Sequence, residues 1–146
     1  MAVYNQGAFQ PKNPEKYVGN GPITYRSSWE LTFMNVCDQH PNIQKWSSES
    51  IKIRYEDPFQ PGKIRNYIPD FFIQYVDKNG ASHAEIIEIK PMTQTLPEAA
   101  KSRKDQEAVV LNDAKWRAAY AWCQANGVKF RIMTEQQLYK SGVGRR

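Results

Sequence analysis

The stretches Tyr67-Ile-Pro-Asp70-Phe-Phe-Ile-Gln-Tyr75 and Ala84-Glu-Ile-Ile-Glu88-Ile-Lys90-Pro91 decide how this chain folds. Their content of Ile, Phe and Tyr is typical of strands. Between them stands Asp77-Lys-Asn-Gly80, and Asn-Gly is the strongest short signal for a hairpin turn. We therefore expect two antiparallel neighbouring strands, over residues 65–76 and 84–90.

Charged side chains are placed on these strands in a pattern that suits metal chemistry. Because strand side chains alternate, Glu88 and Lys90 point to one face, while Ile87 and Ile89 point to the other. Mg²⁺ prefers carboxylate oxygen, which Asp70 and Glu88 supply from adjacent strands. A bound divalent ion lowers the pKa of attacking water and stabilises charge on a phosphate, and Lys90 would assist. The pattern predicts a metal-dependent nuclease site.

A structural interpretation of the same residues stays open. In it, Asp70 and Glu88 are solvated strand residues, Lys90 is their ion-pair partner, and Pro69 marks an edge strand. Short motifs also match by chance. The surrounding sequence nevertheless favours the nuclease site.

Length and composition fit one globular domain with a net positive charge. The chain has 146 residues, of which 40% are hydrophobic and 24% charged. Its formal net charge of +5 and isoelectric point of about 9.2 favour an anionic partner. Charge alone does not separate nucleic acid from an acidic protein or a membrane surface, but beside a metal site double-stranded DNA is the favoured candidate.

The cysteines and the apolar segments indicate the compartment. Cys37 and Cys123 each lie among apolar residues of a predicted helix, so we expect buried free thiols and a reducing cytoplasm. Residues 1–14 lack the basic start and apolar run of a signal peptide, and no apolar span reaches membrane length. We expect a soluble protein without a membrane partner.

The first part of the chain divides into an arm and a helix. Residues 1–22 are rich in Gly and Pro, which predicts an extended N-terminal arm, with residues 23–146 forming the single domain. Ser27 and Glu30 have the spacing of a capping box, so a helix should begin here and stop near Pro41.

The rest of the chain alternates strands and helices. A strand is expected over residues 50–55, a long helix over 97–126 ending at Gly127, a strand over 128–134, and a short last helix ending near Lys140. The long helix should turn these residues to the sheet: Val109, Ala114, Trp116, Ala119, Tyr120 and Cys123. The order α-β-β-β-α-β-α predicts an α/β fold with a central mixed sheet flanked by helices, whose last strand returns parallel to an earlier one.

This order, with Pro69-Asp70 and Glu88-Ile-Lys90 on adjacent strands, resembles the restriction-endonuclease-like core of the PD-(D/E)XK nuclease superfamily. Further segments resemble the head completion nucleases of myovirus-type tailed phages, and together they cover nearly the whole chain. They are Pro11-Lys-Asn-Pro14, Ile23-Thr-Tyr-Arg26-Ser-Ser-Trp29-Glu30, Trp46-Ser-Ser-Glu49, Lys115-Trp116 and Val128-Lys-Phe-Arg-Ile-Met-Thr-Glu135.

The resemblance implies a Mg²⁺-dependent DNA endonuclease, with Mn²⁺ able to substitute. It implies action on packaged double-stranded DNA beside the phage portal and neck proteins, in the host cytoplasm during late virion assembly or in the virion. Two alternatives stay open: a structural neck or DNA-binding protein that keeps the fold without essential catalysis, and an endonuclease subunit of a heteromeric transposase. The sequence gives no oligomeric state.

Residues near the first helix extend the candidate site. Glu30 matches an acid that superfamily members contribute from this helix, which makes it the third candidate metal ligand beside Asp70 and Glu88, although capping alone would also explain it. Arg26 is expected either to hold a DNA phosphate or to form an exposed ion pair. With Lys90, the candidate catalytic set has four members.

The tryptophans, the histidines and the basic residues of the long helix do not belong to the predicted catalytic set. The tryptophans are expected in the core, and His40 and His83 lack the spacing of a zinc site. Basic residues on the long helix and the strand after it are candidate phosphate contacts, without any means of choosing among them. Because no element that reads bases is visible, we expect low sequence specificity.

Overall fold

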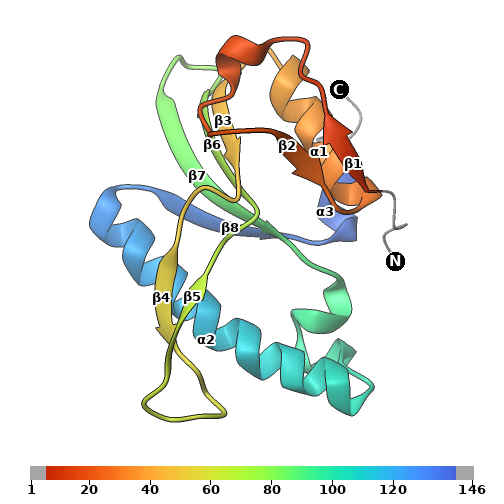
Figure 1. The fold of residues 1–146 in the computed structure, drawn as a ribbon, viewed down its shortest axis with the longest axis vertical. Helices are drawn as coiled ribbons and strands as arrows, with labels where there is room; N and C mark the ends of the chain where they lie inside the picture. Colours follow the sequence, from red (N-terminus) through yellow and green to blue (C-terminus); the bar gives the residue numbers. More distant parts are fainter. Residues whose placement is uncertain (1–5, 141–146) are drawn as a thin grey trace.

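A four-stranded mixed sheet forms the centre of the protein in a computed structural model that describes residues 6–140 (Figure 1). Its strands follow the order β3 (Ile43–Ser48), β6 (Phe71–Val76), β7 (Ser82–Ile89) and β8 (Lys129–Met133). Strands β3 and β7 run antiparallel to β6, which lies between them, and β8 runs parallel to β7. The predicted mixed sheet and its parallel last strand are confirmed.

The turn between β6 and β7 forms as the Asn-Gly pair predicts. The Asp77 carboxylate accepts hydrogen bonds from the backbone N–H groups of Asn79 (2.8 Å) and Ala81 (3.0 Å). Gly80 has a φ of 82°, a left-handed conformation that glycine adopts without strain. The turn fixes the register that places Phe71 opposite Ile87.

Helix α1 (Ser28–Gln39) covers one face of the sheet. Its N-cap is Ser27, whose side chain accepts the N–H of Glu30, and the helix ends before His40, as expected from Pro41. Phe33 lies against Phe71 with ring centroids 4.8 Å apart. Trp29 and Trp46 are buried here, which confirms their place in the core.

Helix α2 (Arg103–Asn126) packs on the opposite face, where Ala119 and Cys123 contact a cluster that includes Ile86. The helix ends at Gly127, whose φ of 70° matches the predicted left-handed cap.

Two predictions for this helix are wrong. The helix begins at Arg103 rather than near Pro97, because Ser102 supplies the N-cap and the preceding segment forms short 3-10 turns. Tyr120 does not face the sheet, since its side chain is 57% exposed.

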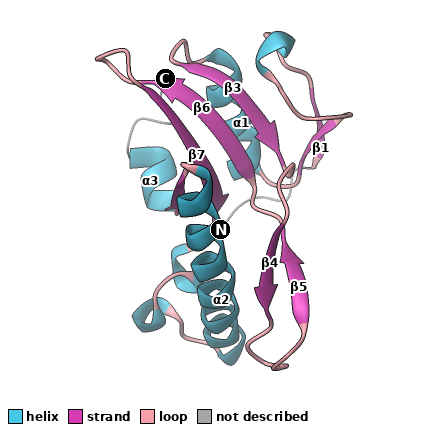
Figure 2. Cartoon of the chain, turned by 90° about the vertical axis from the view of Figure 1, so that its left-hand side faces the viewer, coloured by secondary structure: helices cyan, strands magenta, loops and turns pink. Residues whose placement is uncertain are grey.

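The segment between α1 and β6 differs from the prediction. Strand β3 was not expected, and the predicted strand over residues 65–76 is two strands, β5 (Ile64–Tyr67) and β6. Strand β5 pairs with β4 (Ile53–Glu56) in a separate hairpin. Figure 2 shows this hairpin beside α2, below the four-stranded sheet.

Residues 6–22, within the predicted extended arm, pack against the rest of the domain. Strand β1 (Gly7–Phe9) pairs with β2 (Ile23–Tyr25), and a 3-10 turn (η1, Pro14–Lys16) lies between them. The Phe9 ring packs edge-on against Trp46, with centroids 5.8 Å apart. The segment is therefore part of the domain surface. The first five residues of the predicted arm lie outside the described residues.

A short helix, α3 (Glu135–Lys140), follows β8 at the end of the described residues, which confirms that a last helix is present. Cys37 and Cys123 are buried free thiols, as expected. Within residues 6–140, no helix combines the length and the hydrophobicity needed to cross a bilayer.

Candidate active site

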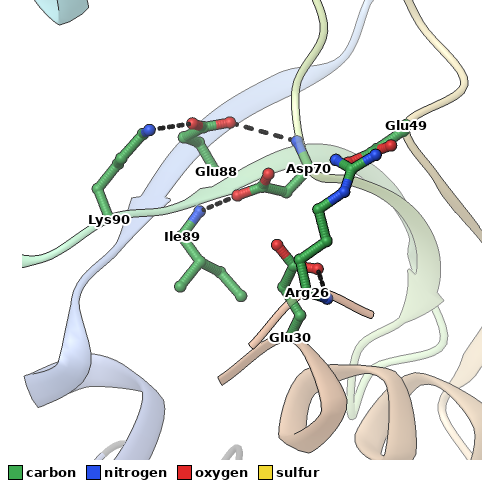
Figure 3. A network of polar contacts seen from close by, with 7 residues as sticks. All are labelled: Arg26, Glu30, Glu49, Asp70, Glu88, Ile89 and Lys90. Carbon is green, nitrogen blue, oxygen red and sulfur yellow. Dashed lines mark hydrogen bonds and ion pairs between the residues drawn. The ribbon is translucent and has the colours of Figure 1, made fainter. Parts of the chain in front are cut away.

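The ends of β6 and β7 bring Asp70 and Glu88 together (Figure 3). The backbone N–H of Asp70 donates to the Glu88 carboxylate (3.2 Å), and the backbone N–H of Ile89 donates to the Asp70 carboxylate (2.7 Å). Each carboxylate is thus held by the backbone of the other segment. These two reciprocal hydrogen bonds restrict the rotation of both acidic side chains.

Lys90 completes the predicted trio. Its ammonium lies 3.5 Å from a Glu88 oxygen, and its side chain is 28% exposed against 5% for Glu88. Ile87 and Ile89 point to the opposite face, where both are buried in the cluster under α1. The alternation predicted from the sequence is confirmed, and the lysine opens toward solvent while the glutamate is enclosed.

Burial disfavours the charged forms of the two acids at this site. Desolvation raises the pKa of Asp70, and repulsion from Glu88 raises it further. The pKa of Glu88 is also raised by burial, although Lys90 opposes the shift. Buried carboxylates that repel one another gain from a proton or from a cation placed between them.

Glu30 reaches the site from the first turn of α1. Its carboxylate accepts the backbone N–H of Arg26 (2.9 Å), one residue before the Ser27 cap, so it has a capping role. Burial raises the pKa of Glu30, and its charge contributes to the raised pKa of Asp70. Both expectations for this glutamate, capping and a place facing the acids, are compatible with its position.

Arg26 lies at the rim and forms an ion pair with Glu49. This is the exposed pairing that the sequence left as its alternative to a phosphate contact. Glu49 follows β3, and its backbone N–H donates to the Asp70 carbonyl (3.0 Å). Its φ of 51° is left-handed, which costs a non-glycine residue about 1–2 kcal/mol. A pocket of about 230 Å³ adjoins this pair, with Asn20, Thr24 and Ser48 in its wall.

Lys115, on α2, is a site residue that the sequence did not single out. Its ammonium lies over the rings of Tyr55 and Tyr67, 6.0 and 5.7 Å from their centroids. Burial lowers its pKa, and so does repulsion from Lys90. Two signals pointed to it: the Lys115-Trp116 segment of the family resemblance, and spacing, since Lys115 shares a helix face with the buried Ala119.

Tyr67 stands behind Glu88 at the end of β5. Its hydroxyl is buried, and both burial and the Glu88 charge raise its pKa. The phenol therefore stays protonated at neutral pH and can act only as a neutral hydrogen-bonding group. Its ring belongs to the apolar cluster under α2.

The donor set suits a hard divalent ion. Within residues 6–140, no group of three or more His, Cys, Asp or Glu side chains converges closely enough to enclose a metal. Mg²⁺ commonly binds one or two carboxylates and keeps water on its other positions, and Asp70 with Glu88 fits that pattern. The three-ligand set with Glu30 stays a prediction.

Comparison with known proteins places the site in a nuclease context. Residues 40–135 match the family described as TnsA-like endonuclease N terminal, a range that includes Asp70, Glu88 and Lys90. The head completion nuclease of Enterobacteria phage T4 is 37% identical over 147 residues, which cover 93% of this chain and 95% of that protein. Both resemblances predicted from the sequence are confirmed, and so is the restriction-endonuclease-like fold.

Proposed function

This chain belongs to the TnsA-like endonuclease family, and we propose that it is a metal-dependent DNA endonuclease whose active site is built on Asp70, Glu88 and Lys90. The observation that carries the proposal is the reciprocal backbone clamp on the two acids. It holds the buried Glu88 and the half-buried Asp70 side by side, with a lysine at the solvent edge. A purely structural site would gain nothing from burying two repelling charges.

Asp70 and Glu88 would hold Mg²⁺, and Glu30 would reach it directly or through a water. When bound, the ion stabilises charge on the phosphate and lowers the pKa of water. The chain's own residues orient the reaction. The N–H of Ile89 holds one Asp70 oxygen, and the other oxygen would be free to hold the ion. Lys90 would position the attacking water or stabilise charge on the phosphate.

Two further cations would act on the substrate. Lys115 approaches from α2 on the side of Glu88, where its charge would favour the developing negative charge of the phosphate. Arg26 would exchange Glu49 for a DNA phosphate, which a guanidinium can hold through two parallel hydrogen bonds. The Glu49 carboxylate therefore competes with the substrate for Arg26.

The biological role that we propose is head completion in a tailed phage. The T4 relative carries that name and matches this chain over nearly its whole length. In this role the enzyme acts on packaged double-stranded DNA at the portal and neck, in the host cytoplasm late in assembly or in the virion. A transposase-type role is the second candidate, because the matching family is described by a TnsA-like endonuclease.

Phage complementation distinguishes these roles from a structural one. A phage that lacks this gene would be supplied with wild-type protein, with Lys90→Ala, or with Lys78→Ala as an exposed lysine control. We expect the Lys90 variant to assemble particles but to lose infectivity, while the control restores it. Full infectivity with Lys90→Ala would contradict essential catalysis. A strict need for a partner transposase, with cutting at element ends, would favour the second candidate.

A further inference from the structure

The β4–β5 hairpin has one buried face and one open face. Ile53, Tyr55 and Tyr67 pack into the cluster under α2. The alternate positions point the other way and are exposed: Lys52, Arg54, Glu56, Ile64, Asn66 and Ile68. Ile64 and Ile68 are 48% and 43% exposed, an unusual state for isoleucine on a strand. This outer face is available to a partner (Figure 2).

The outer face, together with the loop residue Lys63, carries three basic side chains against one carboxylate, that of Glu56. Lys52, Arg54 and the loop residue Lys63 form no ion pair within the described part of the chain. The carboxylate of Glu56 accepts a hydrogen bond from the N–H of Gly62 (2.8 Å), which ties it to the loop between β4 and β5. The partner that this face fits is therefore anionic.

The tip of the hairpin is held by its own hydrogen bonds. The Asp57 carboxylate accepts the N–H of Phe59 (2.8 Å) and pairs with Arg65 (2.6 Å). The Lys63 N–H donates to the Gln60 carbonyl (3.0 Å). These contacts present the 54% exposed Phe59 ring on an ordered loop. The loop is thus a pre-formed end of the same outer face.

The base of the hairpin is fixed to the candidate active site. Strand β5 ends at Tyr67, three residues before Asp70, and the Tyr67 hydroxyl lies beside Glu88. The Lys115 ammonium covers the inner rings of the hairpin while it faces the acids. On the outer face, Ile68 is two residues before Asp70 along the chain, so a ligand at the base of this face would lie near the candidate active site.

We propose that the outer face of the β4–β5 hairpin docks in the major groove of duplex DNA and holds it against the acids. The major groove, about 12 Å wide, admits a two-stranded ribbon. Lys52, Arg54 and Lys63 neutralise phosphates at its walls, while Asn66, directly opposite Arg54, lies toward the base edges. The sequence did not show such an element because β4 and β5 were not expected to pair. The inference rests on the proposed function for the nature of its ligand.

Binding measured without cutting tests the docking. An Asp70→Asn background would be titrated into a fluorescent 30-base-pair duplex at several salt concentrations. The hairpin variant adds Lys52→Ala, Arg54→Ala and Lys63→Ala. The control adds Lys12→Ala, Lys45→Ala and Lys78→Ala, which remove the same charge from exposed residues of the β1–η1 segment, β3 and the β6–β7 turn, elements at the opposite end of the molecule (Figure 1).

We expect the hairpin variant to bind at least tenfold more weakly than the control at physiological salt. The slope of log affinity against log salt should fall by about 2–3, since each phosphate contact contributes about 0.9. Circular dichroism would verify that both variants fold. Equal affinities and slopes would overturn the proposal, and normal DNA binding with lost phage infectivity would assign this face to a protein partner instead. Wild-type protein that binds but never cuts would refute the proposed activity and leave the docking intact.

Discussion

At the scale of single residues, the site is held in a state that costs folding energy. Glu88 is buried and Asp70 is half-buried beside it, and each has a raised pKa in the absence of a cation. The reciprocal backbone hydrogen bonds keep them in place despite their repulsion. A site arranged in this way trades stability for the ability to bind a positive ligand.

The first prediction concerns Asp70→Asn. The pKa of Asp70 in the folded protein lies above its ordinary value of 3.8. The unfolded chain therefore loses this proton first as the pH rises, and the folded state loses stability. In chelator, the variant should melt a few degrees above wild type at pH 8, and the gap should close as the pH falls well below 3.8, where the carboxyl is protonated in both the folded and the unfolded state. Melting curves across this range would measure it. A gap that does not depend on pH would show that Asp70 is not strained by its charge.

The second prediction separates the two roles of Glu30. Glu30→Gln keeps an oxygen that can accept the Arg26 N–H, so the melting temperature should stay close to that of wild type. The lost charge should still slow DNA cutting about tenfold or more. Glu30→Ala should slow cutting and also cost about 1 kcal/mol of stability. If Glu30→Gln cut DNA at the wild-type rate, the only role of Glu30 would be to cap the helix.

The third prediction concerns Lys115. Lys115→Met keeps the apolar stem against Tyr55 and Tyr67 but removes the charge beside the acids. We expect kcat to fall about tenfold to a hundredfold, because one charge-stabilising donor is lost. Lys45→Met, an exposed change on β3, is the control. Single-turnover cutting rates would decide, and equal rates for the two variants would remove Lys115 from the site.

At the scale of elements, the sequence predicted what local signals determine. The Ser27 cap, the Asn-Gly turn and Gly127 set the ends of α1, β6, β7 and α2 within a few residues. Strand β3 escaped prediction because its pairing shifts register between Ile43 and Lys45, so its buried residues do not alternate. The break after β5 arises because Pro69 lacks an N–H and the N–H of Asp70 bonds to Glu88, so neither residue pairs in a strand. This break leaves no mark on the alternation of apolar residues.

The fourth prediction tests how the N-terminal segment is held. Asp38 is buried, and its carboxylate accepts the backbone N–H groups of Lys12 and Asn13, each at 2.9 Å. Asp38→Ala should leave both donors unpaired and cost about 1–3 kcal/mol. Residues 6–22 should then be cleaved faster by a protease at low concentration. Asp113→Ala, which breaks an exposed ion pair on α2, is the control and should change neither property.

At the scale of the whole molecule, the site is assembled from all layers of the fold. The sheet supplies Asp70, Glu88 and Lys90, α1 supplies Glu30, and α2 supplies Lys115. The strand residues could be predicted because a turn and alternation relate them locally. The contribution of α2 could not, because it depends on how the helix packs across the sheet. The hairpin beside α2 was missed for the same reason.

The central claim is that the Asp70 carboxylate directly contacts the ion required for cutting, and a change of ligand chemistry tests it. In Asp70→Cys, a soft sulfur replaces hard oxygen, so Mg²⁺ should no longer support nicking of supercoiled DNA while Mn²⁺ or Cd²⁺ restores part of it. Wild type should prefer Mg²⁺, and Asp70→Asn should be inactive with every metal. Restored cutting of the cysteine variant by the softer ions alone is the predicted result. Cutting by that variant with Mg²⁺ at the wild-type rate would contradict the account.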